Sequence, residues 1–151
     1  MTIIQRRVYL EPKYLDENIM VHLLAKVSSI TLGECTKEYG YIISVNKIVK
    51  ILNNEDTVFT LLFDADTLKP DAGTKLDGIV CMVYKDGIFI DVVNKLKVLI
   101  PSIILKGYLY DEISATYVST NKKIKQGDNI NVVVTASKFS KKGFICVGSL
   151  V

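Results

Sequence analysis

The second half of the chain alternates short apolar runs with turn signals, and this alternation limits the folds open to it. Asp86-Gly87 is a strong hairpin signal, and Gly78 within a run is typical of a bend or a close backbone approach. Residues 102–120 lack a clear period and should bridge the third and fourth strands. Five short strands favour a closed barrel over an open sheet, because closure removes exposed edges. The apolar runs span residues 76–84, 88–92, 96–100, 130–136 and 144–147.

The first half has a helical segment that the second half lacks. Residues 3–10 are β-branched and aromatic, which predicts a strand that Pro12 ends. Residues 15–29 repeat apolar side chains at helical spacing, which predicts a helix that ends before Gly33. The repeating side chains are Ile19, Leu23, Leu24 and Val27.

Two more strands should complete this first unit. Residues 41–51 are expected to form a strand whose alternation places Ile43, Val45 and Val49 on one face. Residues 58–64 are expected to form the next strand, after a polar turn at 53–56. The order strand, helix, strand, strand predicts a small α+β unit. Proline and glycine enter at residues 69–73, so we place the boundary between two domains there, at 1–70 and 71–151.

Composition excludes several classes of protein. No apolar run approaches the roughly 18–20 residues that a membrane span needs. The three cysteines are widely spaced and His22 is the only histidine, which is too few ligands for zinc, so no cofactor is expected. The sequence has no glycine-rich phosphate loop and no nucleophile elbow, which predicts a non-catalytic chain. Asp64 and Asp66 are interpreted as a solvated strand end.

One candidate RNA-binding surface follows from alternation in residues 88–92. Ile88, Ile90 and Val92 should face one way, which leaves Phe89 exposed on the other side of the strand. An exposed aromatic ring there can stack an unpaired base. Filling a protein interface is an equally good role for Phe89. The candidates in this group are Tyr84, Lys85 and Phe89.

A second candidate group lies in the last predicted hairpin. Basic side chains interleaved with an aromatic ring suit the backbone of a single strand, and the net charge of +3 permits this. The alternative is a solubilising lysine-rich loop. The group consists of Lys138, Phe139, Lys141 and Lys142.

Several motifs across both halves resemble one family. They are LEPKYL at 10–15, GECTKEYGYII at 33–43, LKP at 68–70, Gly73, GIV at 78–80, GIF at 87–89 and GSL at 148–150. Together they resemble the larger subunit of the stalk heterodimer in eukaryotic and archaeal-type RNA polymerases, the RNA polymerase II subunit seven family. The stretch at 33–43 is the most specific, and its Cys-Thr and Tyr-Gly pairs are more similar to the RNA polymerase II form than to the RNA polymerase III paralogue.

The resemblance implies a fold and a set of partners. The fold would be an RNP-like α+β tip domain followed by an all-β barrel of the S1/OB type. The tip would dock near the clamp on the largest polymerase subunit and a small core subunit, and a small helical stalk partner would pack along the domain seam. The barrel would contact single-stranded nascent RNA or initiation factors. The docking residues implied are Glu34, Cys35, Thr36, Lys37, Tyr39, Gly40 and Tyr41.

The chain also departs from that family. A short stretch at residues 53–57 replaces a longer glycine-rich loop, and no tail follows Val151. A shortened, lysine-rich version fits a large DNA virus or a reduced eukaryote, with a location in the nucleus of a cell or in a virion or cytoplasmic viral factory. The rival interpretations are a free-standing S1-type RNA-binding or translation-associated protein, and a purely structural subunit whose barrel touches only protein.

Overall fold

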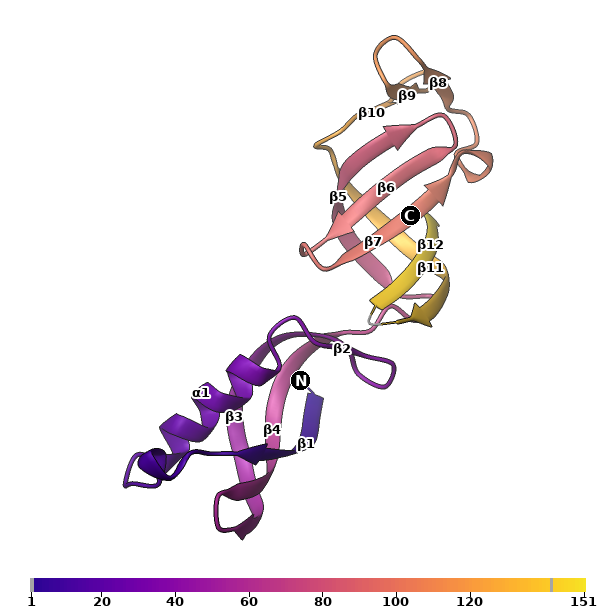
Figure 1. Cartoon of the computed structure of the whole chain (residues 1–151). Helices are drawn as coiled ribbons and strands as arrows, with labels where there is room; N and C mark the ends of the chain where they lie inside the picture. Colours follow the sequence, from indigo (N-terminus) through magenta and orange to yellow (C-terminus); the bar gives the residue numbers. More distant parts are fainter. Residues whose placement is uncertain (1, 142) are drawn as a thin grey trace. The chain divides into compact units, whose positions relative to one another are not determined.

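The computed structural model describes residues 2–141 and 143–151, and Lys142 of the second candidate group lies outside the described residues. The chain divides into two compact units between Lys69 and Pro70 (Figure 1). Among the described residues, no helix has the length and apolar character that crossing a membrane requires.

The first unit is an antiparallel sheet with one α-helix. Its strands lie in the order β1-β4-β3-β2. The long hairpin of β3 and β4 runs beside α1 (Figure 1). The elements are β1 (Thr2–Tyr9), a 3-10 turn η1 (Pro12–Tyr14), α1 (Ile19–Ile30), β2 (Cys35–Thr36), β3 (Gly40–Glu55) and β4 (Val58–Leu68).

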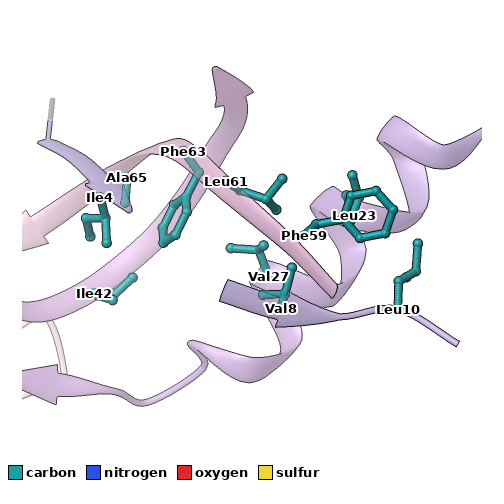
Figure 2. Close-up of a cluster of buried hydrophobic side chains, with 10 residues drawn as sticks. All are labelled: Ile4, Val8, Leu10, Leu23, Val27, Ile42, Phe59, Leu61, Phe63 and Ala65. Carbon is teal, nitrogen blue, oxygen red and sulfur yellow. The ribbon is translucent and has the colours of Figure 1, made fainter. Parts of the chain in front are cut away.

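The core of this unit lies between α1 and one face of the sheet. Figure 2 shows Leu23 and Val27 of α1 beside the buried side chains of β1 and β4. Burying a large apolar side chain contributes roughly 1.5–3 kcal/mol, so this cluster supplies the main stabilisation of the unit. Its members are Ile4, Val8, Leu10, Leu23, Val27, Ile42, Phe59, Leu61, Phe63 and Ala65.

The start of the helix differs from the prediction. The helix begins at Ile19 rather than at residue 15, because Asp16 forms a turn in front of it. The Asp16 carboxylate accepts the backbone N–H of Asn18 at 2.8 Å, and its carbonyl accepts that of Ile19 at 3.2 Å. The helix ends at Ile30, before Gly33 as expected.

The strand β3 contradicts the expected alternation. Its pairing with β4 is shifted by a β-bulge four times, and at each bulge one residue of β3 has no residue opposite it in the register of β4. Ile42, Val45, Ile48 and Ile51 therefore face the core at a spacing of three, whereas Ile43, Asn46, Val49 and Leu52 are the exposed bulge residues.

The turn after β3 also lies later in the chain than the predicted turn at residues 53–56. Asn53 and Asn54 continue the strand and pair with Thr60 and Phe59. The turn itself is Asp56-Thr57, and Asp56 adopts a positive φ of 55°. Asparagine and aspartate favour this left-handed conformation, but the sequence offered four candidate turn residues in a row.

The second unit is a closed five-stranded barrel, as predicted. The strands lie in the order β11-β12-β7-β6-β5, with β11 paired to β5 to close the ring. A separate three-stranded sheet has the order β10-β9-β8. The elements are β5 (Lys75–Tyr84), β6 (Gly87–Val92), β7 (Leu96–Pro101), η2 (Ser102–Ile104), β8 (Leu109–Asp111), β9 (Thr116–Val118), β10 (Lys123–Ile124), β11 (Asn129–Ser140) and β12 (Gly143–Leu150).

Local details of the barrel agree with the sequence pattern. Ile88, Ile90 and Val92 are buried inside it. Gly78 is required by close approach, since a Cβ there would lie 2.3 Å from a methyl of Ile90. The connection between β7 and β11 contains a small sheet that its sequence does not predict. The strands of this sheet have only two or three residues each, which is too short to show a period.

Candidate nucleic-acid interface and docking segment

The outer face of the barrel carries a row of apolar side chains that crosses four strands. Phe89 of β6 pairs with Leu99 of β7, which pairs with Val147 of β12, which pairs with Ala136 of β11. Phe89, Leu99 and Val147 are half-buried, and their neighbours along each strand point into the barrel. Phe89 is therefore less exposed than predicted, because the row packs side by side.

A more polar row lies next to it on the same face. Lys97 of β7 is exposed and pairs with Asp91 of β6. Ile145 of β12 is 63% exposed and pairs with Lys138 of β11. Two lysines beside apolar side chains can bind phosphates while bases contact the apolar row. We call these two rows the barrel face.

Several residues of the barrel face were missed by the sequence analysis. Lys97, Leu99, Ile145 and Val147 lie on it by cross-strand register. Because side chains two residues apart lie on the same side of a strand, the polar Lys97 could have placed both itself and Leu99 on the outer side. Their neighbours across the sheet depend on strand order, which local sequence does not encode.

One end of the barrel face is the turn between β5 and β6. Tyr84 is 49% exposed and its ring meets that of Phe89 edge to face, with centroids 6.2 Å apart. Lys85 is exposed in the turn. The structure thus brings Tyr84, Lys85 and Phe89 together.

The turn is held by a buried tyrosine from the small sheet. The hydroxyl of Tyr117 donates to the carbonyl of Tyr84 at 2.5 Å and lies 2.9 Å from that of Lys85. Burial, the main cause, raises the pKa of Tyr117 above its ordinary value, with smaller contributions from Tyr110 and Asp86. The phenol therefore remains a neutral donor at physiological pH.

The second candidate group lies toward the other end of the barrel. Lys138 and Phe139 belong to β11 rather than to a loop, and only Lys141 of the described residues occupies the turn. Lys138 and Lys141 are exposed, and the ring of Phe139 packs against Phe144 with centroids 5.2 Å apart. Phe139 is thus partly engaged within its own hairpin.

Strand register separates the two turns. Because β12 runs parallel to β7 and β7 begins away from the β5–β6 turn, the β11–β12 turn lies at the opposite end of the barrel. A single strand of RNA that contacted both Lys85 and Lys141 would have to cross the barrel face between them.

The cysteine beneath this face is inert, since burial raises the pKa of Cys146 to about 11.

The candidate docking residues form a small hairpin, which we call the docking segment (residues 34–41). Cys35 and Thr36 of β2 pair with Tyr41 and Gly40 of β3, and the hydroxyl of Thr36 accepts the backbone N–H of Tyr39 at 3.0 Å. Lys37 and Glu38 are exposed at the turn, and Thr36, Tyr39 and Tyr41 are half-buried. These side chains can reach a partner, whereas Cys35 and Gly40 are buried and shape the hairpin.

Two contacts fix the docking segment to the sheet. Arg6 of β1 donates to both carboxylate oxygens of Glu34, at 2.7 and 3.0 Å. This fork geometry is directional and half-buried, and the pair raises the pKa of Arg6. Gly40 has a φ of +78°, and a Cβ there would lie 2.2 Å from the carbonyl oxygen of Leu68. Glu34 is thus engaged within the chain and orders the segment.

A metal centre has no support in this geometry. Across residues 2–141 and 143–151, no three histidine, cysteine, aspartate or glutamate side chains gather closely enough to hold an ion. Asp66 accepts hydrogen bonds from Ser44 and Asn46 at 3.3 and 3.2 Å. Asp64 is only 6% exposed, so the interpretation of a solvated strand end was wrong for this residue.

Comparison with known proteins agrees with the closed barrel. The model of the S1 RNA binding domain matches residues 69–145. The chain belongs to the S1 RNA binding domain family.

Two curated proteins are similar over nearly the whole chain. DNA-directed RNA polymerase II subunit rpb7 of Dictyostelium discoideum is 24% identical, covering 97% of this chain and 91% of that protein. DNA-directed RNA polymerase II subunit RPB7 of Glycine max is 20% identical, covering 98% and 89%. The resemblance to the RNA polymerase II subunit seven family is thereby confirmed.

A solved structure is similar only in part. The apo form of Mycoplasma genitalium RNase R matches with a TM-score of 0.44 and 21% identity, over 53% of this chain and 13% of that one. A match of this extent carries no argument about function.

Proposed function

We propose that the chain is a non-catalytic subunit of a multisubunit DNA-directed RNA polymerase. The observation that carries the proposal is that similarity to the two polymerase subunits extends through both units, whereas the S1 match is confined to residues 69–145. A free-standing S1-type protein has no need of a first unit with a rigid docking segment.

The first unit would attach the chain to the enzyme. The docking segment would contact the largest polymerase subunit and a small core subunit near the clamp, and a small helical protein would complete the stalk. This assignment is supported by the exposed turn of Lys37 and Glu38 and by the ion pair of Arg6 with Glu34, which holds that turn in one geometry. A preordered segment binds with less loss of conformational entropy.

The barrel face would contact nascent RNA or initiation factors in transcription. The half-buried row at Phe89 offers stacking surface, and Lys85, Lys97, Lys138 and Lys141 are exposed on or beside it. The chain would be located where the polymerase is, in the nucleus of a cell or in a virion or viral factory.

Affinity purification of the tagged chain tests the polymerase assignment. Large polymerase subunits should co-elute with it, and replacing Lys37 and Glu38 with alanine should weaken that association without unfolding the chain. Consistent elution of the chain free of polymerase subunits, with RNA or ribosomal proteins instead, would favour the free-standing S1 protein.

Photocrosslinking of nascent RNA in the assembled enzyme tests the barrel face. A crosslink at Phe89 or Lys138 is expected. If barrel residues crosslink only to protein, the barrel is a structural part of the assembly and does not bind RNA.

A further inference from the structure

The sheet of the first unit has a second face, opposite α1. Phe63 and Ala65 of β4 belong to the core shown in Figure 2, so the side chain of Asp64 between them points the other way. Strand register places Ile3 of β1 and Lys47 of β3 on either side of Asp64. We call this surface the Asp64 face.

The carboxylate of Asp64 is not satisfied by the residues that the structure describes. Its Oδ1 is buried and has no hydrogen-bond partner among them, and the whole residue is only 6% exposed. Lys47 is exposed, and among residues 2–141 and 143–151 it forms no ion pair with Asp64. Buried polar atoms are nearly always paired, and an unpaired one destabilises the free chain.

The same face carries exposed apolar side chains and a hollow. Ile3 and Tyr9 of β1 are 43% and 51% exposed and alternate with the buried Ile4 and Val8. Farther along, a hollow of about 290 Å³ is lined by Arg7, Asn53, Glu55, Val58 and Thr60. The Asp64 face thus combines exposed apolar side chains with a hollow that contains an arginine and a glutamate.

We propose that the Asp64 face binds a segment of another protein subunit, which brings an arginine or lysine side chain to Oδ1 of Asp64. Charge complementarity selects this occupant, because the unpaired carboxylate attracts a cation and repels RNA phosphates. The apolar stem of an arginine or lysine also fits beside Ile3. The inference rests on the proposed function, since the partner is taken to be a subunit of the same polymerase assembly.

Replacing one carboxylate tests the proposal. In the isolated chain, Asp64→Asn removes a buried unpaired charge, so the thermal unfolding midpoint should rise by about 4 °C or more. In the assembled enzyme, the same variant should bind its partner at least about tenfold more weakly, because the partner's cation loses its carboxylate. Asp66→Asn is the matched control on the same strand and face, and its binding should be that of the wild type.

Three outcomes decide between the proposals. If wild-type chain fails to co-purify with polymerase subunits, both the proposed function and this inference fail. If wild type is retained and Asp64→Asn is retained equally at every salt concentration, the inference alone fails. A lower unfolding midpoint for isolated Asp64→Asn also overturns it, since the carboxylate would then serve the fold of the chain itself.

A photoreactive residue identifies the occupant directly. Gln5 is exposed and pairs with Leu62, one row away from Asp64, so Gln5→p-benzoylphenylalanine reports on the same face. In the purified enzyme it should crosslink to a peptide of another subunit that contains arginine or lysine. A crosslink to RNA, a crosslink to a second copy of this chain, or an intact enzyme without a crosslink overturns the proposal.

Discussion

Removing the hydroxyl of Tyr117 should loosen the β5–β6 turn. In Tyr117→Phe the ring and its packing remain, but the single hydroxyl proton that the carbonyls of Tyr84 and Lys85 can accept is lost. One hydrogen bond contributes about 0.5–1.5 kcal/mol. At about 1 kcal/mol, the unfolding midpoint should fall by about 4–8 °C for a unit of this size. Tyr110→Phe is the control. The ring of Tyr110 packs against that of Tyr117 with centroids 5.3 Å apart, and its hydroxyl forms no hydrogen bond among the described residues.

The same variant should bind single-stranded RNA less tightly. Tyr84 and Lys85 lie beside Phe89, so a mobile turn should cost about 1 kcal/mol, the lower end of one base-stacking contribution, or about fivefold in affinity. Fluorescence anisotropy with a short labelled RNA measures this. An unchanged unfolding midpoint would refute the role of the hydroxyl. A lower midpoint with unchanged RNA affinity would instead remove the turn from the RNA-binding surface.

Stability at high pH provides a second readout of Tyr117. Burial raises its folded pKa above the ordinary tyrosine value of 10.0, so the folded state favours the neutral phenol. This stabilisation is present below the unfolded pKa and is lost as pH rises through the higher folded pKa. The free energy of unfolding of the wild type should fall above about pH 10, and that of Tyr117→Phe should fall less. Parallel curves for the two proteins would contradict this.

Other expectations follow from the two units. Phe89→Ala should weaken RNA binding by roughly 1–3 kcal/mol, measured by anisotropy, and equal affinity would make Phe89 a protein contact. Replacing Lys138 and Lys141 together with alanine should reduce the slope of log affinity against log salt by about 1.4, and an unchanged slope would place the phosphates elsewhere. Arg6→Lys, which loses the paired hydrogen bonds to Glu34, should speed hydrogen exchange in residues 33–41 by about fivefold, whereas unaltered exchange would show that the hairpin holds itself. Cys146 should resist alkylation at pH 8 in the folded chain, because burial raises its pKa to about 11, and rapid labelling would indicate opening of the barrel.

The barrel was predictable because its signals are local. Asp86-Gly87 marks a hairpin, Pro101 ends a strand, and buried and half-buried residues alternate from Ile88 to Val92. Each of these features depends on a few neighbouring residues. The same alternation could place Phe89 on the outer side of its strand.

The rest depends on contacts between distant residues. The bulges of β3 are set by pairing with β4, so the sequence alone suggested a period of two where the structure has three. The support of Tyr84 by Tyr117 spans 33 positions in the chain. Burial of Asp64 likewise follows from its neighbours Ile3 and Lys47 on two other strands.

The bulges of β3 also set a rule for how this hairpin can change in length. From Val45 to Ile51, six steps along β3 match the four steps from Ala65 to Leu61 on β4. An insertion that preserves the facing of every side chain must therefore add three residues to one strand and two to the other. Insertions and deletions in this ratio should be tolerated, both in natural relatives and in designed variants. Equal additions to both strands would instead turn the core-facing side chains of β3 toward solvent.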